Sequence, residues 1–325
     1  MYKYLPFGGI GIMSMSTAAK RKKPSLFTEM KRKPLLFLLL FPAVLYTFIY
    51  GYCTLPFLAI AFEKYSVKKL LFSPFVGLSN FRFFFRSSWA SIVTENTIIM
   101  NLLFIIFGIL LSVTLAILIN ELTPTRFIKT LQSSMLLPYF ISWVIVSYIL
   151  FGLLSTQSGL INVLLQRLGY QPVGFYNDPK YWYTIFTILT LWKGAGYTSI
   201  IYLASITGID QELYEAAIID GANRWQKIFR ITIPLLIPMI SILTLMNAGR
   251  LFSSDWNMYY SIVQNNGAIL ATAEVIDTYV FRTFKVTGNP GLSMATNLYQ
   301  SIVGFVLVFT SNMAVKKFYP EGSLF

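Results

Sequence analysis

The side chains that could take part in recognition or proton transfer gather in a few short stretches of an otherwise apolar chain. The densest stretch lies within residues 208–232, where Asp210, Glu215 and Asp220 are followed by three basic residues. Such groups form charge-assisted hydrogen bonds to a partner. The chain has no His and one Cys. A His- or Cys-rich metal site and a disulfide within the chain are therefore excluded.

The sequence contains no recognisable catalytic pattern. It lacks a His general base and has no G-x-x-x-x-G-K-[ST] loop to hold nucleotide phosphates. Asp255, Glu274 and Asp277 are acids that a membrane glycosyltransferase could use, but no spacing arranges them as a catalytic pair. We therefore expect a protein that moves or senses a ligand and is not an enzyme. A membrane glycosyltransferase stays open as the least favoured alternative.

A second group of polar and aromatic side chains lies inside or beside long apolar runs. Burying polar groups in lipid is costly, so we expect them to face a bundle interior or a cavity. Lys193 either lines a pathway or serves helix packing, by snorkelling or by pairing with an acid. The amides could equally bond between helices, and the aromatics could be interface anchors. The candidate pathway residues are Trp192, Lys193, Tyr197, Asn247, Arg250, Trp256, Tyr259, Tyr260, Asn297 and Gln300.

The composition predicts a multi-pass membrane protein. The 325 residues are 55% hydrophobic and only 12% charged, and the mean hydropathy is +0.62. Soluble domains carry about a quarter charged residues. Apolar runs of about 20 residues match the thickness of the hydrocarbon layer. They predict six spanning helices, at residues 35–62, 97–120, 131–155, 183–206, 233–253 and 294–315.

The distribution of charge predicts the orientation. The net charge is +13, which fits orientation in a bilayer better than nucleic-acid binding. Residues 1–33, the two connections at 121–130 and 208–232, and the C-terminal end together carry 15 basic residues, against 9 on the other connections. The positive-inside rule then places the first set in the cytoplasm. The predicted domains are a basic cytoplasmic tail (1–33), a transmembrane domain (34–318) and a short cytoplasmic end (319–325).

Residues 208–232 are predicted to form a helix, a glycine turn and a second helix. Asp210 is a good N-cap for the first helix, and Gly221 stands where a helix ends in the left-handed conformation. Asn223 is a second N-cap, and its helix is expected to run until Pro234 opens the next apolar segment. Both helices are amphipathic.

A set of residues at fixed spacing in this segment resembles the EAA signature of permease subunits of bacterial ABC importers: Glu215, Ala216, Ala217, Asp220, Gly221, Ala222, Phe229, Ile231, Pro234 and Pro238. The wider run LWKGAGYTSIIYLASITGIDQELYEAAIIDGANRWQKIF and the later EVIDTYVFR are similar to the polysaccharide-type branch of the carbohydrate importers, which is related to the larger permease of the maltose importer. The resemblance extends over residues 35–318.

The resemblance implies an all-α membrane protein with the six-span type I ABC importer permease fold and a cytoplasmic coupling helix, in the bacterial inner membrane with both termini cytoplasmic. In that family the coupling helix docks in a groove of an ATPase subunit. The residues that match this role are Leu213, Glu215, Ala216, Ala217, Asp220, Gly221, Ala222 and Arg224.

The resemblance also implies the partners. These are a second permease in a heterodimeric pore, two ATPase subunits that hold ATP and Mg, an extracytoplasmic solute-binding protein and an oligosaccharide. The chain itself is expected to hold no cofactor or metal and to bind no nucleic acid.

The implied function is import of an oligosaccharide by alternating access. Lys193 and Arg250 suit an acidic sugar, as in an alginate importer, while neutral oligosaccharides stay open. The alternative is an ion-coupled secondary transporter or channel. That class uses buried carboxylates, and the predicted spans have no acidic residue near their middle.

Overall fold

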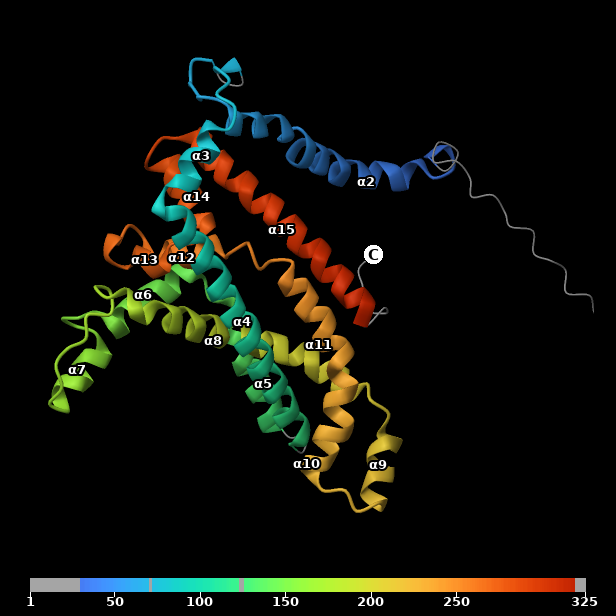
Figure 1. Ribbon diagram of the computed structural model, residues 1–325. Coiled ribbons are helices and arrows are strands. Elements are labelled where there is room, and N and C mark those ends of the chain that lie inside the picture. The colour runs from blue at the N-terminus through green and yellow to red at the C-terminus, as the bar shows by residue number, and fades with distance from the viewer. Residues whose placement is uncertain (1–29, 70–71, 123–125, 319–325) are drawn as a thin grey trace, which may run out of the picture. The chain divides into compact units, whose positions relative to one another are not determined.

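The computed structural model describes residues 30–69, 72–122 and 126–318, so the predictions for residues 1–29 and 319–325 lie outside the described residues. The described chain is nearly all helical, as predicted, and its β pairing is an isolated bridge between Glu63 and Phe75. The chain divides into two compact units, Met1–Pro56 and Phe57–Phe325. The second unit contains the helices that carry the candidate sites, and Figure 1 labels these helices in chain order.

The first unit is built around an apolar helix. α2 (Pro34–Thr47) begins with Pro34, whose missing N–H costs nothing in a first turn, and continues as the π-helical turn η1 (Phe48–Tyr52). No residue of α2 is buried. A helix that is apolar on all sides and exposed is suited to contact lipid.

The second unit contains long helices joined by short ones. In chain order they are η2 (Leu55–Phe62), α3 (Ser79–Arg86), α4 (Ser88–Glu121), α5 (Arg126–Phe140), α6 (Trp143–Leu154), α7 (Leu160–Arg167), η4 (Pro179–Tyr181), α8 (Trp182–Thr207), α9 (Gln211–Ile219), α10 (Arg224–Lys227), η5 (Ile228–Thr232), α11 (Ile233–Ala248), α12 (Trp256–Val263), η6 (Gly267–Ile269), α13 (Leu270–Ala273), α14 (Ile276–Lys285) and α15 (Pro290–Phe318).

The prediction of six continuous spans needs correction. Within the described residues four helical runs are long and apolar enough to cross a membrane: Pro34–Phe62, Ser88–Glu121, Arg224–Ala248 and Pro290–Met313. α8, at the predicted fourth span, is 26 residues long but is not among them. Its Trp, Tyr, Gly and Lys residues make it less apolar.

The predicted third span is a broken pair of helices. α5 and α6 meet at a bend of 97°. Pro138 lies in the last turn of α5, and the Ser142 hydroxyl accepts a hydrogen bond from the Ile145 N–H to cap α6. A proline followed by an N-cap stops one helix and starts another. This is why an unbroken apolar run does not form one straight span.

Two buried clusters hold the long helices together. α4 lies along α8. Tyr202 and Ile206 of α8 pack with Ala116 of α4 and Leu236 of α11. A second cluster joins α8 to α12, where the ring centroids of Phe186 and Tyr259 are 4.6 Å apart. Between membrane helices such contacts stabilise through close van der Waals packing and not through transfer from water, because lipid tails are as apolar as these side chains.

The helix that starts after Asn223 does not stop at Pro234, which corrects a second prediction. α10, η5 and α11 form one helical run from Arg224 to Ala248. Pro234 falls in the first turn of α11, directly after the π-helical turn. The changed hydrogen-bond register of a π turn lets a helix continue past a residue that has no N–H.

Candidate functional site

The segment 208–232 forms two capped helices around a glycine turn. The Asp210 carboxylate accepts a hydrogen bond from the Glu212 N–H at 3.0 Å. Gly221 has φ of 78°. Asn223 and Gln226 accept each other's backbone N–H, at 2.9 and 2.7 Å, in a capping box. The predicted caps and the left-handed glycine are confirmed.

α9 lies on the surface, and none of its residues is buried. Ile219 is 85% exposed, and on α10 Trp225 is 69% exposed. The Trp225 and Phe229 rings lie 6.1 Å apart, and large exposed apolar residues of this kind are candidates for contact with a partner or with lipid. We call Leu213, Ile218, Ile219, Trp225 and Phe229 the α9 apolar patch; all five are exposed. The predicted coupling set did not include the last four.

The predicted coupling residues lie together around this patch. Ala217 and Ala222 are half-buried. The others are exposed: Leu213, Glu215, Ala216, Asp220, Gly221 and Arg224. α9 and α10 lie at the end of the second unit where α4 ends and α5 begins, opposite α3 and α14 (Figure 1).

Tyr214 links α9 to the helix that follows. Its hydroxyl lies 2.9 Å from the Thr232 hydroxyl, and Thr232 is only 3% exposed. Leu213 on α9 and Leu235 on α11 also border a cavity of 470 Å³. Sequence reasoning missed Tyr214, because the contact joins residues 18 positions apart across a turn and no local pattern signals it.

Lys193 is held by the broken helix. Its ammonium donates hydrogen bonds to the carbonyls of Pro138 at 3.1 Å and Tyr139 at 2.7 Å, and also to the Ile141 carbonyl. It lies 5.3 Å from the centre of the Trp143 ring. Carbonyls at the end of a helix lack partners within the helix. Lys193 therefore satisfies the end of α5, which agrees with its alternative role in packing, with carbonyls in place of an acid.

α8 approaches α5 closely beside Lys193. A Cβ on Gly196 would overlap the Met135 carbonyl, whereas one on Gly194 would meet open space. The Tyr197 ring stacks on the Tyr139 ring, with centroids 4.6 Å apart. Glycine is thus required at 196 for the two backbones to meet.

A cavity of 290 Å³ brings two of the predicted pathway residues together. We call it the Arg250 cavity. Its lining includes Asn247 and Arg250, and five helices contribute to it: Asn101, Phe104, Ile105, Trp143, Thr190, Asn247, Arg250, Ser253, Asp255 and Met258. Asn101 is held by the carbonyls of Thr97 and Leu251.

The two charged groups of the Arg250 cavity differ in their partners. One oxygen of Asp255 accepts from Trp143 Nε1 at 2.6 Å, and the other accepts from the backbone N–H groups of Asn257 and Met258. Arg250 is exposed, and its guanidinium has no ion pair or hydrogen bond within the described residues. The cavity therefore offers one free cation.

The remaining predicted pathway residues lie elsewhere. Tyr259 is buried in the core. The Gln300 side-chain amide donates hydrogen bonds to the Phe252 carbonyl and to the Asp277 carboxylate, so it holds the segment after α11 against α14. Trp256 and Tyr260 stack on each other at 4.8 Å. Three more are not in the lining of the Arg250 cavity: Trp192, Tyr197 and Asn297.

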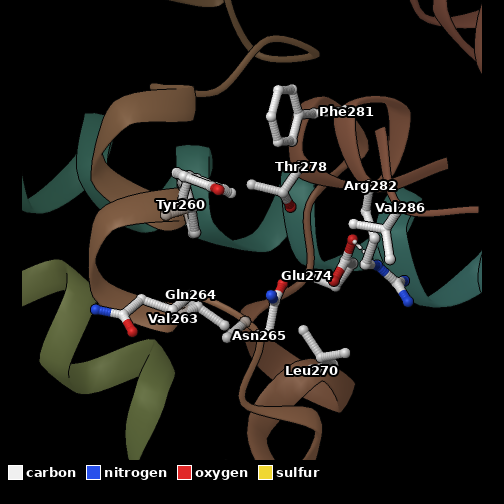
Figure 2. Close-up of a pocket in the computed structure, with 12 residues that line it drawn as sticks. Tyr260, Val263, Gln264, Asn265, Leu270, Glu274, Thr278, Phe281, Arg282 and Val286 are labelled. Atoms are coloured by element: carbon white, nitrogen blue, oxygen red, sulfur yellow. Dashed lines mark hydrogen bonds and ion pairs between the residues drawn. The ribbon is translucent and has the colours of Figure 1, made fainter. Parts of the chain in front are cut away.

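An ion pair joins α14 to the turn that follows α13 (Figure 2). Arg282 Nε lies 3.1 Å from the Glu274 carboxylate, which is 2% exposed. The guanidinium lies 4.7 Å from the centre of the Trp89 ring. Burial raises the pKa of the Glu274 carboxyl although Arg282 opposes this. The adjoining cavity of 20 Å³ has room for about one water.

Comparisons with known proteins agree over most of the chain. The family model described as "Binding-protein-dependent transport system inner membrane component" matches residues 108–254. Protein LplB of Bacillus subtilis is 31% identical over 299 residues, 92% of this chain and 93% of that protein. The polygalacturonan/rhamnogalacturonan transport system permease protein YteP of Bacillus subtilis is 31% identical over 93% of this chain and 94% of that protein.

Two solved structures of transporter chains are also similar to this chain over most of its length. A chain of a bacterial ABC transporter involved in the import of the acidic polysaccharide alginate superposes with a TM-score of 0.83 and 31% identity, over 90% of this chain and 99% of that chain. The bacterial alginate ABC transporter in complex with alginate pentasaccharide-bound periplasmic protein gives 0.81, over 90% and 98%.

Proposed function

This chain belongs to the family of inner membrane components of binding-protein-dependent transport systems, and from that premise we propose that it forms one half of a pore for an acidic oligosaccharide. It is a permease subunit and not an enzyme. The cargo leaves an extracytoplasmic binding protein and reaches the cytoplasm by alternating access.

The observation that carries the proposal is the α9 apolar patch. It stands beside a left-handed glycine turn between two helices that run into the membrane domain. An exposed apolar patch with flanking charges suits a partner groove that is apolar inside and polar at its rim. We assign this partner as an ATPase subunit, which holds the ATP and Mg that the chain itself does not bind.

The Arg250 cavity supports the choice of cargo. A planar guanidinium without a partner matches the geometry of a carboxylate. Asn247 and Asn101 line the same cavity, and their amides suit sugar hydroxyls. The alginate transporter that this chain resembles imports an acidic polysaccharide. We assign binding of the sugar carboxylate to Arg250 and not to Lys193, because Lys193 is already bound to backbone carbonyls.

The assembly follows from the same premise. A second permease completes the pore, and two ATPases bind one coupling segment each. Both termini and the 208–232 segment then lie in the cytoplasm, in agreement with the excess of basic residues there.

The test uses the complete complex in proteoliposomes with its binding protein and labelled acidic oligosaccharide. Uptake is expected to require ATP. Gly221→Val should abolish uptake, because a β-branched residue at φ of 78° distorts the turn. Gly169→Val is the matched control: Gly169 has φ of 82° and equally open space, but lies in the connection before α8.

Glu215→Lys should likewise abolish uptake while the chain still inserts in the membrane. Full uptake by both Gly221→Val and Glu215→Lys would contradict the coupling assignment. Uptake without ATP hydrolysis would favour the secondary transporter, and formation of a new glycosidic product would favour the glycosyltransferase.

A further inference from the structure

A larger cavity, of 520 Å³, lies between α6 and the end of α12. We call it the Tyr148 cavity. Aromatic side chains and polar groups line it, among them Tyr148, Phe151, Tyr176, Ser261, Gln264 and Asn265. None of these is among the residues that the sequence predicted for a pathway.

The Arg250 and Tyr148 cavities are lined by successive stretches of the same two helices, α6 and α12. Trp143 and Met258 line the Arg250 cavity, while Phe151 and Ser261, further along α6 and α12, line the Tyr148 cavity. Trp143 and Phe151 are eight residues apart, a rise of about 12 Å in an α-helix. An oligosaccharide of several rings can occupy both cavities at once, whereas a single ring bound in one cavity leaves the other empty.

The aromatic side of the cavity offers flat apolar faces. Tyr148 is 72% exposed and Phe151 is 55% exposed. The Phe151 and Tyr176 rings lie 5.7 Å apart at 57°. Rings of this kind give a large contact area with little loss of side-chain freedom, and they pack well on the C–H faces of sugars.

The opposite side offers hydrogen-bonding groups. Gln264 and Asn265 are exposed, and their side-chain amides make no hydrogen bond within the described residues. The Asn265 amide points toward Glu274 and also lines the 20 Å³ cavity, while Gln264 points away from it (Figure 2). Each amide has two donor hydrogens and one acceptor oxygen, which suits the paired donor and acceptor character of sugar hydroxyls. The neighbouring Asn266 side chain donates a hydrogen bond to the Tyr176 carbonyl at 2.7 Å, so the turn after α12 is held against the segment that carries Tyr176.

Gln264 is held in an unfavourable backbone conformation. Its φ is 51° and its ψ is −121°, and among the described residues it alone has positive φ without being glycine. Such strain persists where the surrounding structure enforces it, and it is concentrated at ligand sites. Glycine would adopt this conformation freely. We take this strained position as support for a role of the Gln264 side chain in ligand binding.

We propose that the Tyr148 cavity is a second carbohydrate subsite, which binds sugar rings of the same oligosaccharide chain that occupies the Arg250 cavity. Tyr148 and Phe151 stack on the rings, and the Gln264 amide bonds to their hydroxyls. The subsite selects for chain length, because only a chain long enough to reach it gains these contacts. This proposal rests on the proposed function.

The test compares uptake of a disaccharide and a hexasaccharide of the same acidic sugar by the complete complex in proteoliposomes. The hexasaccharide to disaccharide ratio of initial rates is the readout, because the binding protein is the same in all samples. Tyr148→Ala should lower this ratio roughly 2- to 10-fold, as expected for loss of one aromatic contact. Tyr170→Ala, an exposed tyrosine outside the cavity, should leave it unchanged.

Gln264→Gly separates binding from folding. It should lower the same ratio while the melting temperature of the complex stays equal or rises, because glycine relieves the backbone strain. An unchanged ratio in both Tyr148→Ala and Gln264→Gly overturns the subsite. Equal loss of both oligosaccharides, with weaker assembly of the complex, also overturns it and assigns this face to the partner permease. If the unmodified complex takes up neither sugar, the proposed function falls and the subsite falls with it.

Discussion

The hydroxyl of Tyr214 lies 2.9 Å from the hydroxyl of Thr232, and this hydrogen bond joins the exposed helix α9 to the π-helical turn that leads into α11. Thr232 is buried, so its position is fixed by the membrane domain. A partner that displaced α9 would act on the membrane domain through this contact as well as through the chain. π turns are frequent at functional sites, where the helix ladder can change register.

Tyr214→Phe removes this hydrogen bond and little else. We expect the oligosaccharide transported per ATP hydrolysed to fall about fivefold, the size of a coupling free energy of 1 kcal/mol. Thr232→Val should have the same effect, and the double variant no more than either alone, because all three remove one contact. Thr232→Ser keeps the hydroxyl and should keep the ratio. A normal ratio in Tyr214→Phe would show that the contact does not carry coupling.

Lys193→Met leaves the carbonyls at the end of α5 without their partner. We expect the folded complex in detergent to lose about 2 to 4 kcal/mol, since hydrogen bonds to a charged donor contribute about 1.5 to 3 kcal/mol each and holding the side chain costs entropy. Lys180→Met is the control. Lys180 is exposed and pairs with Asp178 and the neighbouring Tyr181 ring at the surface, so thermal melting should barely change. Equal melting temperatures of the two variants would exclude this role for Lys193.

Gly196→Ala places a methyl group on the Met135 backbone. We expect a loss of about 1 to 3 kcal/mol or more, because backbone cannot move aside as a side chain end can. Gly194→Ala adds the same methyl in open space two residues away and should be neutral or stabilising. Thermal melting of both variants measures the difference. A neutral Gly196→Ala would contradict the close approach of α8 and α5.

Arg250→Gln should alter which oligosaccharide is preferred. The variant keeps hydrogen-bonding groups but loses the charge, so uptake of an acidic oligosaccharide should fall roughly 10- to 100-fold. Uptake of its methyl ester, which has no negative charge, should change little. The ratio of the two rates is the measurement. If uptake of both substrates falls equally, Arg250 has a structural role and does not bind the carboxylate.

The raised pKa of the Glu274 carboxyl predicts how the stability of the protein depends on pH. Burial raises the pKa of its carboxyl in the folded chain above the ordinary value of 4.5, in spite of Arg282. As pH rises above 4.5, the Glu274 carboxyl loses its proton in the unfolded chain but keeps it in the folded chain. The free energy of unfolding therefore falls progressively, until the pH passes the pKa of the folded state. Glu274→Gln should flatten the fall of melting temperature over this window. Asp178→Asn, at an exposed acid whose pKa is lowered by Lys180, should leave that fall in place.

The local features of residues 208–232 were accessible from sequence because they depend on neighbours in the chain. Asp210, Gly221 and Asn223 cap or end helices through contacts within three residues. The all-helical class likewise follows from long apolar runs. Family membership follows from residues at fixed spacing in one continuous segment.

The breaks in the helices were harder to predict. Pro138 and Pro234 have the same chemistry, yet α5 ends two residues after Pro138, while the helix passes through Pro234. The difference lies in what surrounds each proline: Lys193 from another helix binds the free carbonyls in the first case, and a π turn absorbs the defect in the second.

The sequence by itself therefore determined the class, the family and the caps around Gly221, since each depends on residue types within a few positions. Only the tertiary structure decided which charges are free. Lys193 and Arg250 look alike in an apolar sequence, but folding places the carbonyls of a broken helix around the first and an open cavity beside the second. A charge is available to a ligand only where folding leaves it unpaired, and pairing between distant helices is not written in local spacing.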